Sequence, residues 1–187
     1  MEIGQYRHLL IVDLEATCCD QGSIPRQEME TIEIGAVMLA VDSLVTVDEF
    51  DRFVRPVRHP RLTEFCTRLT SITQADLDQA ALFPQVLGEF QEWFKNRQPL
   101  LFCSWGEYDR NQLRQDCQYH GIAYPFADAH WNIKRAFCDA LGRKKPCGMA
   151  QALALAGLAL EGTHHRGIDD ARNIARLMPR IMHRVGS

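Results

Sequence analysis

The chain has 187 residues, of which 46% are hydrophobic and 24% are charged, and its formal net charge is -3. This length and hydrophobic content predict a single domain spanning residues 1–187, with a core at about 6–183. The negative charge excludes a protein that wraps nucleic acid electrostatically over a broad surface, because such proteins carry a marked basic excess.

The seven cysteines are odd in number, widely spread and mostly set among apolar neighbours, as in a reduced intracellular protein. They form no C-x-x-C pair, and Cys18 and Cys19 lack a further ligand at zinc spacing, so we expect no structural zinc site. An apolar run begins within a few residues of Met1, which leaves no room for a signal peptide, and no stretch approaches a membrane span. We therefore expect a cytoplasmic protein without a membrane partner.

Three strands are predicted at the start of the chain. Residues 8–15 are almost continuously apolar, as in a central strand covered on both faces. Residues 31–41 and 44–54 follow as an antiparallel pair, separated by the short polar turn Asp42-Ser43.

The periodicity then becomes helical, beginning with a Thr-x-x-Asp cap at Thr73. Gly121 ends a later helix. The predicted helices are residues 73–80, 83–97, 107–120, 134–141, 148–156 and 167–183, and the two further strands are 99–104 and 131–133. This order predicts an α/β protein with a mixed five-stranded sheet flanked by α-helices, whose ligands bind at the carboxyl ends of the strands.

Two acidic residues stand at the end of the first strand. Asp13 and Glu15 are two positions apart, and since strand side chains alternate between faces, both carboxylates point the same way. Neighbouring anions repel each other, and such a pair persists when cations lie between them. The pair therefore predicts a divalent-metal site. Two bound Mg²⁺ would move the net charge from -3 to about +1, with the gain focused in one phosphate-attracting cleft.

Helical spacing selects two further acids. In the last helix Asp170 shares its flank with apolar residues, whereas Asp169 lines up with three arginines. In the earlier helix Asp109 lies on the apolar side and Glu107 on the polar side. We therefore expect Asp109 and Asp170 to face inward and the other two acids to face solvent.

Together with His165, these acids match the needs of phosphodiester hydrolysis, which uses two divalent ions roughly 3.5 to 4 Å apart and a general base. Carboxylate oxygens suit Mg²⁺ or Mn²⁺ better than Zn²⁺. A histidine with an ordinary pKa near 6.5 can take a proton from water at neutral pH, and a loop before a helix can swing it over the metals.

Each residue also has a purely structural explanation. Asp13 and Glu15 can be a solvated strand end, the two helical acids can complement a helix dipole, and a loop histidine is usually a surface or hydrogen-bonded residue. We assign His164 to that last class. The joint occurrence of the other residues in one order favours the catalytic interpretation.

Four segments carry these residues: IVDLEATC at 11–18, EIGAV at 33–37, SWGEYD at 104–109 and HRGIDD at 165–170. Together they resemble the DEDDh 3′→5′ exonucleases of the RNase H-like fold. The EATC run and the segments at 65–73 and 131–134 are more similar to the branch with the histone-mRNA and small-RNA exoribonucleases and the bacterial KapD-like proteins. That branch usually has Gly where this chain has Ser71, so a positive φ would be strained there.

The resemblance implies that two metal ions, Mg²⁺ or Mn²⁺, are held by Asp13, Glu15, Asp109 and Asp170, with His165 as general base. It also implies that the terminal nucleotide is gripped around Leu14, Ala16, Thr17, Leu69, Thr70 and His165. An apolar side chain can pack on a base without reading its identity, and a hydroxyl or amide can hold a 3′-OH. A core position is an equal alternative for Leu69, and we expect Trp105 and Trp131 to fill core volume.

The sequence therefore predicts a metal-dependent 3′→5′ exonuclease that releases nucleoside 5′-monophosphates, with RNA or short single strands as substrate. Two alternatives stay open: a DNA-directed trimming or proofreading exonuclease, and a non-catalytic RNA-binding module. The intact acid set argues against the module, because four mutually repelling carboxylates have no other reason to persist. We expect no accessory nucleic-acid-binding segment, so the cleft or an unidentified protein partner would select the substrate.

Overall fold

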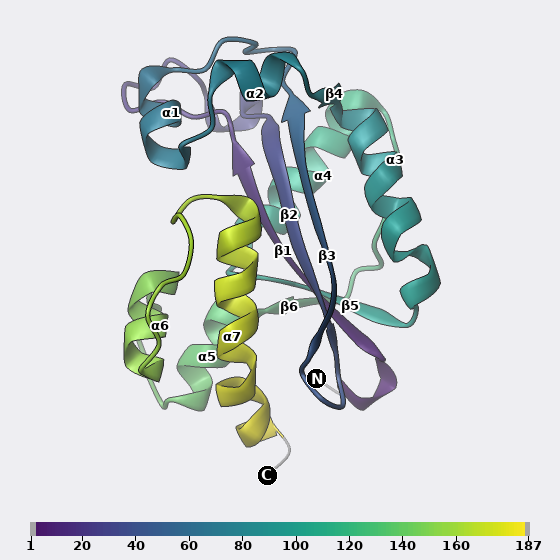
Figure 1. The fold of residues 1–187 in the computed structure, drawn as a ribbon, viewed down its shortest axis with the longest axis vertical. Coiled ribbons are helices and arrows are strands. Elements are labelled where there is room, and N and C mark those ends of the chain that lie inside the picture. Colours follow the sequence, from purple (N-terminus) through teal and green to yellow (C-terminus); the bar gives the residue numbers. More distant parts are fainter. Residues whose placement is uncertain (1–2, 186–187) are drawn as a thin grey trace.

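A mixed sheet forms the centre of the computed structural model, which describes residues 3–185 (Figure 1). Its six strands are β1 (His8–Ala16), β2 (Thr31–Ala40), β3 (Thr46–Arg55), β4 (Ala81–Leu82), β5 (Leu100–Ser104) and β6 (His130–Asn132). They lie in the order β4-β3-β2-β1-β5-β6. The neighbours β1, β2 and β3 are antiparallel, whereas β5 runs parallel to β1, β6 to β5 and β4 to β3.

The predicted α/β class and all five predicted strands are confirmed. The sixth strand, β4, has two residues at the edge beside β3 and is too short to give a periodic signal. As the apolar run predicts, β1 is central: its residues from Leu9 to Val12 are fully buried.

Seven α-helices are described: α1 (Glu64–Thr70), α2 (Gln74–Asp78), α3 (Phe83–Phe94), α4 (Tyr108–His120), α5 (Ile133–Ala140), α6 (Met149–Ala156) and α7 (Gly167–Val185). Three short 3₁₀ turns accompany them, η1 (Ile3–Gln5), η2 (Arg26–Glu28) and η3 (Lys95–Arg97). The alternation of β1 side chains divides the core, because Leu9 and Ile11 pack with α5, α6 and α7, whereas Leu10 and Val12 pack with α3 and α4. The helices therefore cover both faces of the sheet (Figure 1).

Helix α1 was not predicted. Thr63 caps its start by accepting a hydrogen bond from the Cys66 amide, and Ser71 ends it in the left-handed region at φ 62°. The serine therefore adopts the positive φ that the family's usual glycine would tolerate better. In the next helix, the predicted cap is confirmed, because Thr73 and Asp76 form a reciprocal capping box.

Two glycines bring the start of α7 against the sheet. A Cβ atom added to Gly35 of β2 would lie 2.0 Å from the carbonyl carbon of Gly167. Backbone therefore packs directly on backbone here, which places the first turn of α7 beside the end of β1. Within the described range, no helix is both long and apolar enough to cross a bilayer.

Candidate active site at the carboxyl end of β1

The paired acids of β1 lie on the face of the sheet that α7 covers. Asp13 is half-buried and Glu15 is buried, and both side chains point the same way as Leu9 and Ile11, as strand alternation requires. Asp13, Glu15 and Asp170 of α7 each offer a carboxylate oxygen within 4.8 Å of the others. Two segments separated by more than 150 residues therefore converge on one group of acids.

Asp109 approaches from the start of α4. It is buried, and its Oδ1 atom accepts a 3.0 Å hydrogen bond from the Leu14 amide of β1. Glu107 lies outside this group, exposed and paired with Arg110. The structure thus places Asp109 inward and Glu107 outward, as helical spacing predicts.

A pocket of about 370 Å³ contains all four acids and His165. Its walls comprise Asp13, Leu14, Glu15, Cys18, Leu69, Trp105, Tyr108, Asp109, Gly148, Met149, His164, His165 and Asp170. Leu14 and Leu69 therefore lie in the pocket walls, and their contact with a nucleotide stays a prediction. Trp105, which was also expected to fill core volume, is half-buried against Phe137 and lines the pocket, whereas Trp131 is buried in the core as expected.

The loop before α7 wraps around the Asp170 carboxylate. The amide of His165 donates to Asp170 Oδ2 at 3.0 Å, and His164 Nδ1 lies 2.9 Å from the same oxygen. His165 adopts a left-handed backbone conformation with φ 64°. Asp169 does not line the pocket, but it is half-buried rather than solvated. Its carboxylate accepts a 2.8 Å hydrogen bond from the Thr163 amide.

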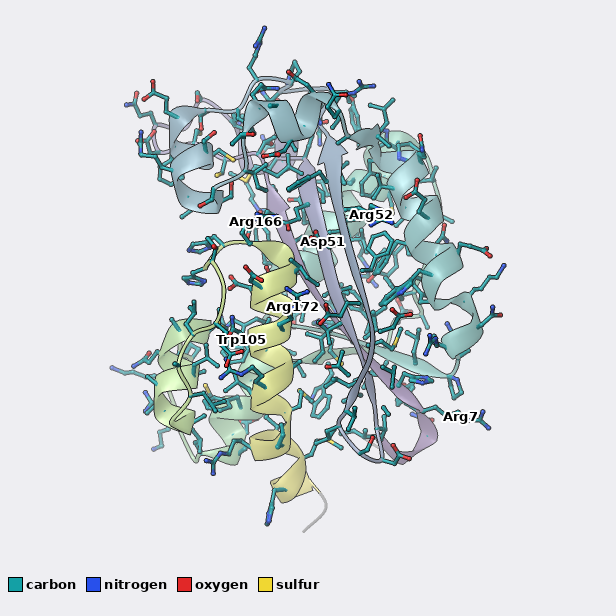
Figure 2. All side chains as sticks on the ribbon, in the orientation of Figure 1. Arg7, Asp51, Arg52, Trp105, Arg166 and Arg172 are labelled. Carbon is teal, nitrogen blue, oxygen red and sulfur yellow. The ribbon has the colours of Figure 1, made fainter. Side chains whose placement is uncertain are left out.

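A buried ion pair anchors this loop to the sheet. Glu33 of β2 is fully buried and accepts hydrogen bonds from Arg166 and, at 2.9 Å, from the Gly167 amide. Figure 2 shows Arg166 at the N-terminal end of α7. Because Arg166 directly follows His165, the pair fixes the part of the chain that carries the predicted base.

Burial and mutual repulsion raise the pKa values of the acids. Burial, followed by Glu33, Asp170 and Asp109, raises the pKa of Glu15 from 4.5 to about 9, and burial raises that of Asp109 to about 6. The pKa of Asp13 lies well above its ordinary value for the same reasons, and burial also raises the pKa of Asp170.

Among residues 3–185, no Lys or Arg forms an ion pair with Asp13, Glu15, Asp109 or Asp170. The charge of Lys134 opposes the rise in the pKa of Asp109, and His164 and His165 oppose the rise in the pKa of Asp170. A cluster of hard oxygen donors that is not paired with Lys or Arg fits divalent cations of the Mg²⁺ and Mn²⁺ class.

The imidazole of His165 is suited to accept a proton. Burial, and next the neighbouring His164, lower its pKa below 6.5, although Asp170 opposes this. The ring is therefore neutral near pH 7.

Three residues expected near the nucleotide do not line the pocket. Ala16 is buried, Thr17 Oγ1 accepts a hydrogen bond from the Glu30 amide, and Thr70 Oγ1 donates to the Cys66 carbonyl. Both hydroxyls are thus engaged within the protein, and contact of this backbone with a nucleotide stays a prediction. His164 is hydrogen-bonded, as expected, and its partner is the Asp170 carboxylate, so that it lies in the cleft.

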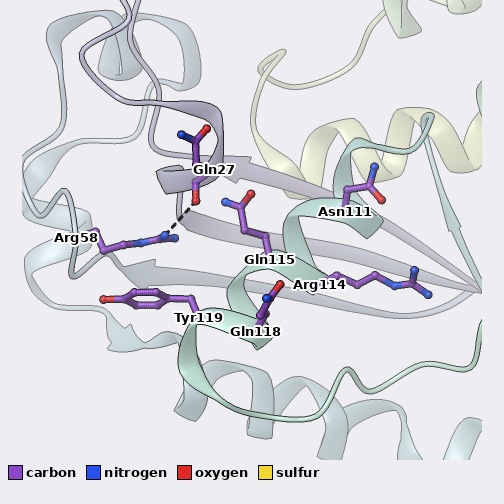
Figure 3. Close-up of a pocket in the computed structure, with 7 residues that line it drawn as sticks. All are labelled: Gln27, Arg58, Asn111, Arg114, Gln115, Gln118 and Tyr119. Carbon is purple, nitrogen blue, oxygen red and sulfur yellow. Dashed lines mark hydrogen bonds between the residues drawn. The ribbon is translucent and has the colours of Figure 1, made fainter.

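A second, larger hollow of about 580 Å³ lies along α4 (Figure 3). It is lined by Gln27, Arg58, Asn111, Arg114, Gln115, Gln118 and Tyr119. The Arg58 guanidinium lies 4.0 Å above the Tyr119 ring and donates to the Gln27 carbonyl. This hollow shares no residue with the acidic pocket and has no carboxylate or imidazole in its walls, so the hydrolytic chemistry belongs to the smaller pocket.

Comparisons with known proteins agree with this geometry. The model of the exonuclease family RNase_T matches residues 10–178. The chain is 31% identical to the 3′-5′ exonuclease Snipper of Drosophila melanogaster, covering 95% of this chain and 70% of that protein. It is 34% identical to the 3′-5′ exoribonuclease 1 of Rattus norvegicus and 36% identical to the ERI1 exoribonuclease 3 of Homo sapiens. It covers 53% and 55% of these two proteins, so it spans about half of their length.

Solved structures give the same result. The nuclease domain of 3′hExo, a DEDDh family member bound to rAMP, superposes with a TM-score of 0.87 at 33% identity. The match covers 96% of this chain and 93% of that domain. A second similar structure concerns the 3′-end specific recognition of a histone mRNA stem-loop by a 3′-exonuclease. It superposes with a TM-score of 0.87 at 31% identity, and the match covers 96% of this chain and 64% of that chain.

Proposed function

The chain belongs to the DEDDh exonuclease family, and we propose that it is a 3′→5′ exonuclease that removes nucleotides from a free 3′ end, with RNA as the preferred substrate. The observation that carries this proposal is the convergence of four acids and the His165 side chain on one pocket. The proposed catalytic unit is one exonuclease domain, residues 1–187, and its proposed location is the cytoplasm. The seven free cysteines support a reducing compartment.

Asp13, Glu15, Asp109 and Asp170 would hold the divalent cations, for which we propose Mg²⁺ or Mn²⁺. When bound, two such cations lower the pKa of water and stabilise the charge that develops on the phosphoryl group. The four carboxylates offer only oxygen atoms, so the part of the pocket that they form is the part that suits these hard cations.

His165 would act as the general base. Its neutral ring accepts a proton from the water molecule whose oxygen attacks phosphorus, and the bond from phosphorus to the preceding O3′ breaks. The products are a nucleoside 5′-monophosphate and a strand shortened by one residue with a new 3′-OH. The role of the Glu33–Arg166 pair would be to hold the loop so that this ring faces the pocket.

Leu14 and Leu69 would hold the terminal base from the pocket walls. Apolar side chains contact a base face without reading its hydrogen-bonding edge, so we expect little preference for base identity. The pocket volume lies within the range typical of small-ligand sites, which suits one nucleotide rather than a duplex end.

The preference for RNA rests on the relatives. Two of them are named exoribonucleases, and the superposed structures contain rAMP or concern a histone mRNA stem-loop. A non-catalytic RNA-binding module is disfavoured, because such a module has no need of four mutually repelling carboxylates in one pocket.

The experiment is digestion of matched RNA and DNA oligonucleotides, labelled at the 5′ end, with Mg²⁺, Mn²⁺ or EDTA. We expect a ladder that shortens from the 3′ end, nucleoside 5′-monophosphates as products, faster loss of RNA than of DNA, and no reaction with EDTA. The matched control is Asp13→Asn, which removes one acid with almost no change in side-chain volume. Faster loss of DNA would make the enzyme DNA-directed, and absence of mononucleotide release from either strand with either metal would contradict the proposal.

A further inference from the structure

His164 lies inside the cleft but has no role in the proposed hydrolysis. Its Nδ1 atom is 2.9 Å from Asp170 Oδ2, and its ring stacks on that of His165 with centroids 3.9 Å apart. Its side chain is 39% exposed, so solvent and ions can reach it from the mouth of the pocket.

Together with two neighbours, His164 forms a donor set of a different kind from the four acids. His164, His165 and Asp170 each offer one ligand atom within 4.8 Å of the others, which gives two imidazole nitrogens and one carboxylate oxygen. Three ligands of this type with a fourth, open position are typical of Zn²⁺, which binds imidazole far better than Mg²⁺ does.

The backbone holds the three residues close together. The rings of His164 and His165 are stacked, His165 has a left-handed backbone conformation, and its amide donates to the Asp170 carboxylate. Such a hydrogen bond orients a ligating carboxylate. Because a metal ion lies in the plane of each imidazole that binds it, one ring would rotate about its side-chain bonds to bring both nitrogens onto one ion. Asp13 and Glu15 lie close to Asp170 and add the negative charge that attracts a cation.

The two donor sets share Asp170. A cation held by His164 and His165 would therefore take one carboxylate from the oxygen-rich set and would also occupy the ring that we assign as general base.

We propose that His164, His165 and Asp170 form an inhibitory Zn²⁺ site at the mouth of the catalytic pocket. This inference rests on the proposed function, because its consequence is that zinc at low concentration stops hydrolysis even when Mg²⁺ is present in large excess. Zinc binding itself can be measured without nucleic acid and without hydrolysis.

The first test measures binding of Zn²⁺ alone to the full chain, by competition with a chromophoric zinc indicator. His164→Asn removes one ligand, and His164→Gln serves as a second variant in case the first unfolds. The matched control is His59→Asn, because His59 bonds Glu28 and does not line the cleft. Substitution of a residue that only supports a metal ligand already weakens metal affinity about 10- to 100-fold. Since His164 is itself a proposed ligand, we expect the His164 variants to bind Zn²⁺ at least about 100-fold more weakly and the control to bind it unchanged.

Co²⁺ provides a second binding readout, since tetrahedral nitrogen coordination gives strong visible absorption that a purely oxygen-bound ion lacks. We expect this absorption in the wild-type protein and in His59→Asn, and its loss in the His164 variants. Equal zinc affinity and an unchanged Co²⁺ spectrum in folded His164 variants would show that these ions bind elsewhere and would overturn the proposal.

The second test measures hydrolysis in excess Mg²⁺ while Zn²⁺ is titrated, with each variant compared with its own zinc-free rate. We expect the inhibitory midpoint to rise at least about tenfold in the His164 variants. An unchanged midpoint would overturn the inhibitory role. If no variant hydrolyses nucleic acid with any metal, the proposed function fails, and the binding test still decides whether the zinc site exists.

Discussion

The amide of Leu14 donates a 3.0 Å hydrogen bond to Asp109 Oδ1, which joins the end of β1 to the start of α4 across 95 positions of the sequence. This contact turns the Asp109 carboxylate toward the acids of β1. It also ties the backbone between Asp13 and Glu15 to Asp109, so that one hydrogen bond links the positions of three of the four acids.

Removal of the proposed base is expected to stop hydrolysis without unfolding the protein. A positioned general base accelerates a reaction about 10²- to 10⁴-fold, so His165→Ala should slow mononucleotide release at least about 100-fold. Thermal unfolding and Mn²⁺ affinity should stay near the wild-type values. His59→Ala is the matched control, and undiminished hydrolysis by His165→Ala would exclude this ring from the mechanism.

Cation removal is expected to destabilise the protein at high pH. The folded pKa values of Glu15 and Asp109, about 9 and 6, lie above their ordinary values of 4.5 and 3.8. In the metal-free protein these acids therefore contribute stability below about pH 4, and this contribution is lost as the pH rises through 6 and toward 9.

Bound cations favour the ionised carboxylates, so the effect of Mn²⁺ should grow with pH. At a free concentration 100 times the Kd the gain is about 2.7 kcal/mol. Thermal unfolding with Mn²⁺ or EDTA should differ clearly at pH 8 and little at pH 5. An equal difference at both pH values would contradict this explanation.

Loss of the loop anchor is expected to reduce both stability and turnover. Glu33→Ala leaves Arg166 and the Gly167 amide without their buried acceptor, which should cost about 3 kcal/mol in urea unfolding. We expect kcat to fall more than KM rises, because the loop carries the base. The control, Glu49→Ala, breaks the exposed pair with Arg172 and should cost at most about 1 kcal/mol. Equal effects of the two variants would show that the buried pair has no special role.

The close approach of β2 and α7 makes Gly35 sensitive to any side chain. An added methyl group would lie 2.0 Å from the Gly167 backbone, so Gly35→Ala must displace α7 and should cost about 3 kcal/mol together with most of the activity. Gly88→Ala is the control, since this exposed helical position has open space, and it should gain about 0.5–1 kcal/mol. Urea unfolding measures both, and a neutral Gly35→Ala would show that the contact is loose.

The periodic parts of the sequence predict the fold and the acids well. Strand alternation placed Asp13 and Glu15 on one face, and helical spacing separated Asp109 and Asp170 from their acidic neighbours. The family prediction is confirmed, and so is the RNase H-like fold, by the superposition on 3′hExo. The functional roles of the individual side chains stay predictions.

The missed features depend on contacts that local sequence does not encode. The strand β4 exists through pairing with β3, and His164 lies in the cleft through its contact with Asp170. The Glu33–Arg166 pair joins residues 133 positions apart, which no periodicity reveals.

The most direct measurement of the central claim is the number of Mn²⁺ ions bound at saturation, determined by electron paramagnetic resonance on the wild-type protein and on Asp13→Asn and Asp170→Asn. We predict two ions for the wild-type protein and fewer for each variant, with native circular dichroism spectra throughout. Two ions in both folded variants, or none in the wild-type protein, would contradict the assignment of these carboxylates as the metal site.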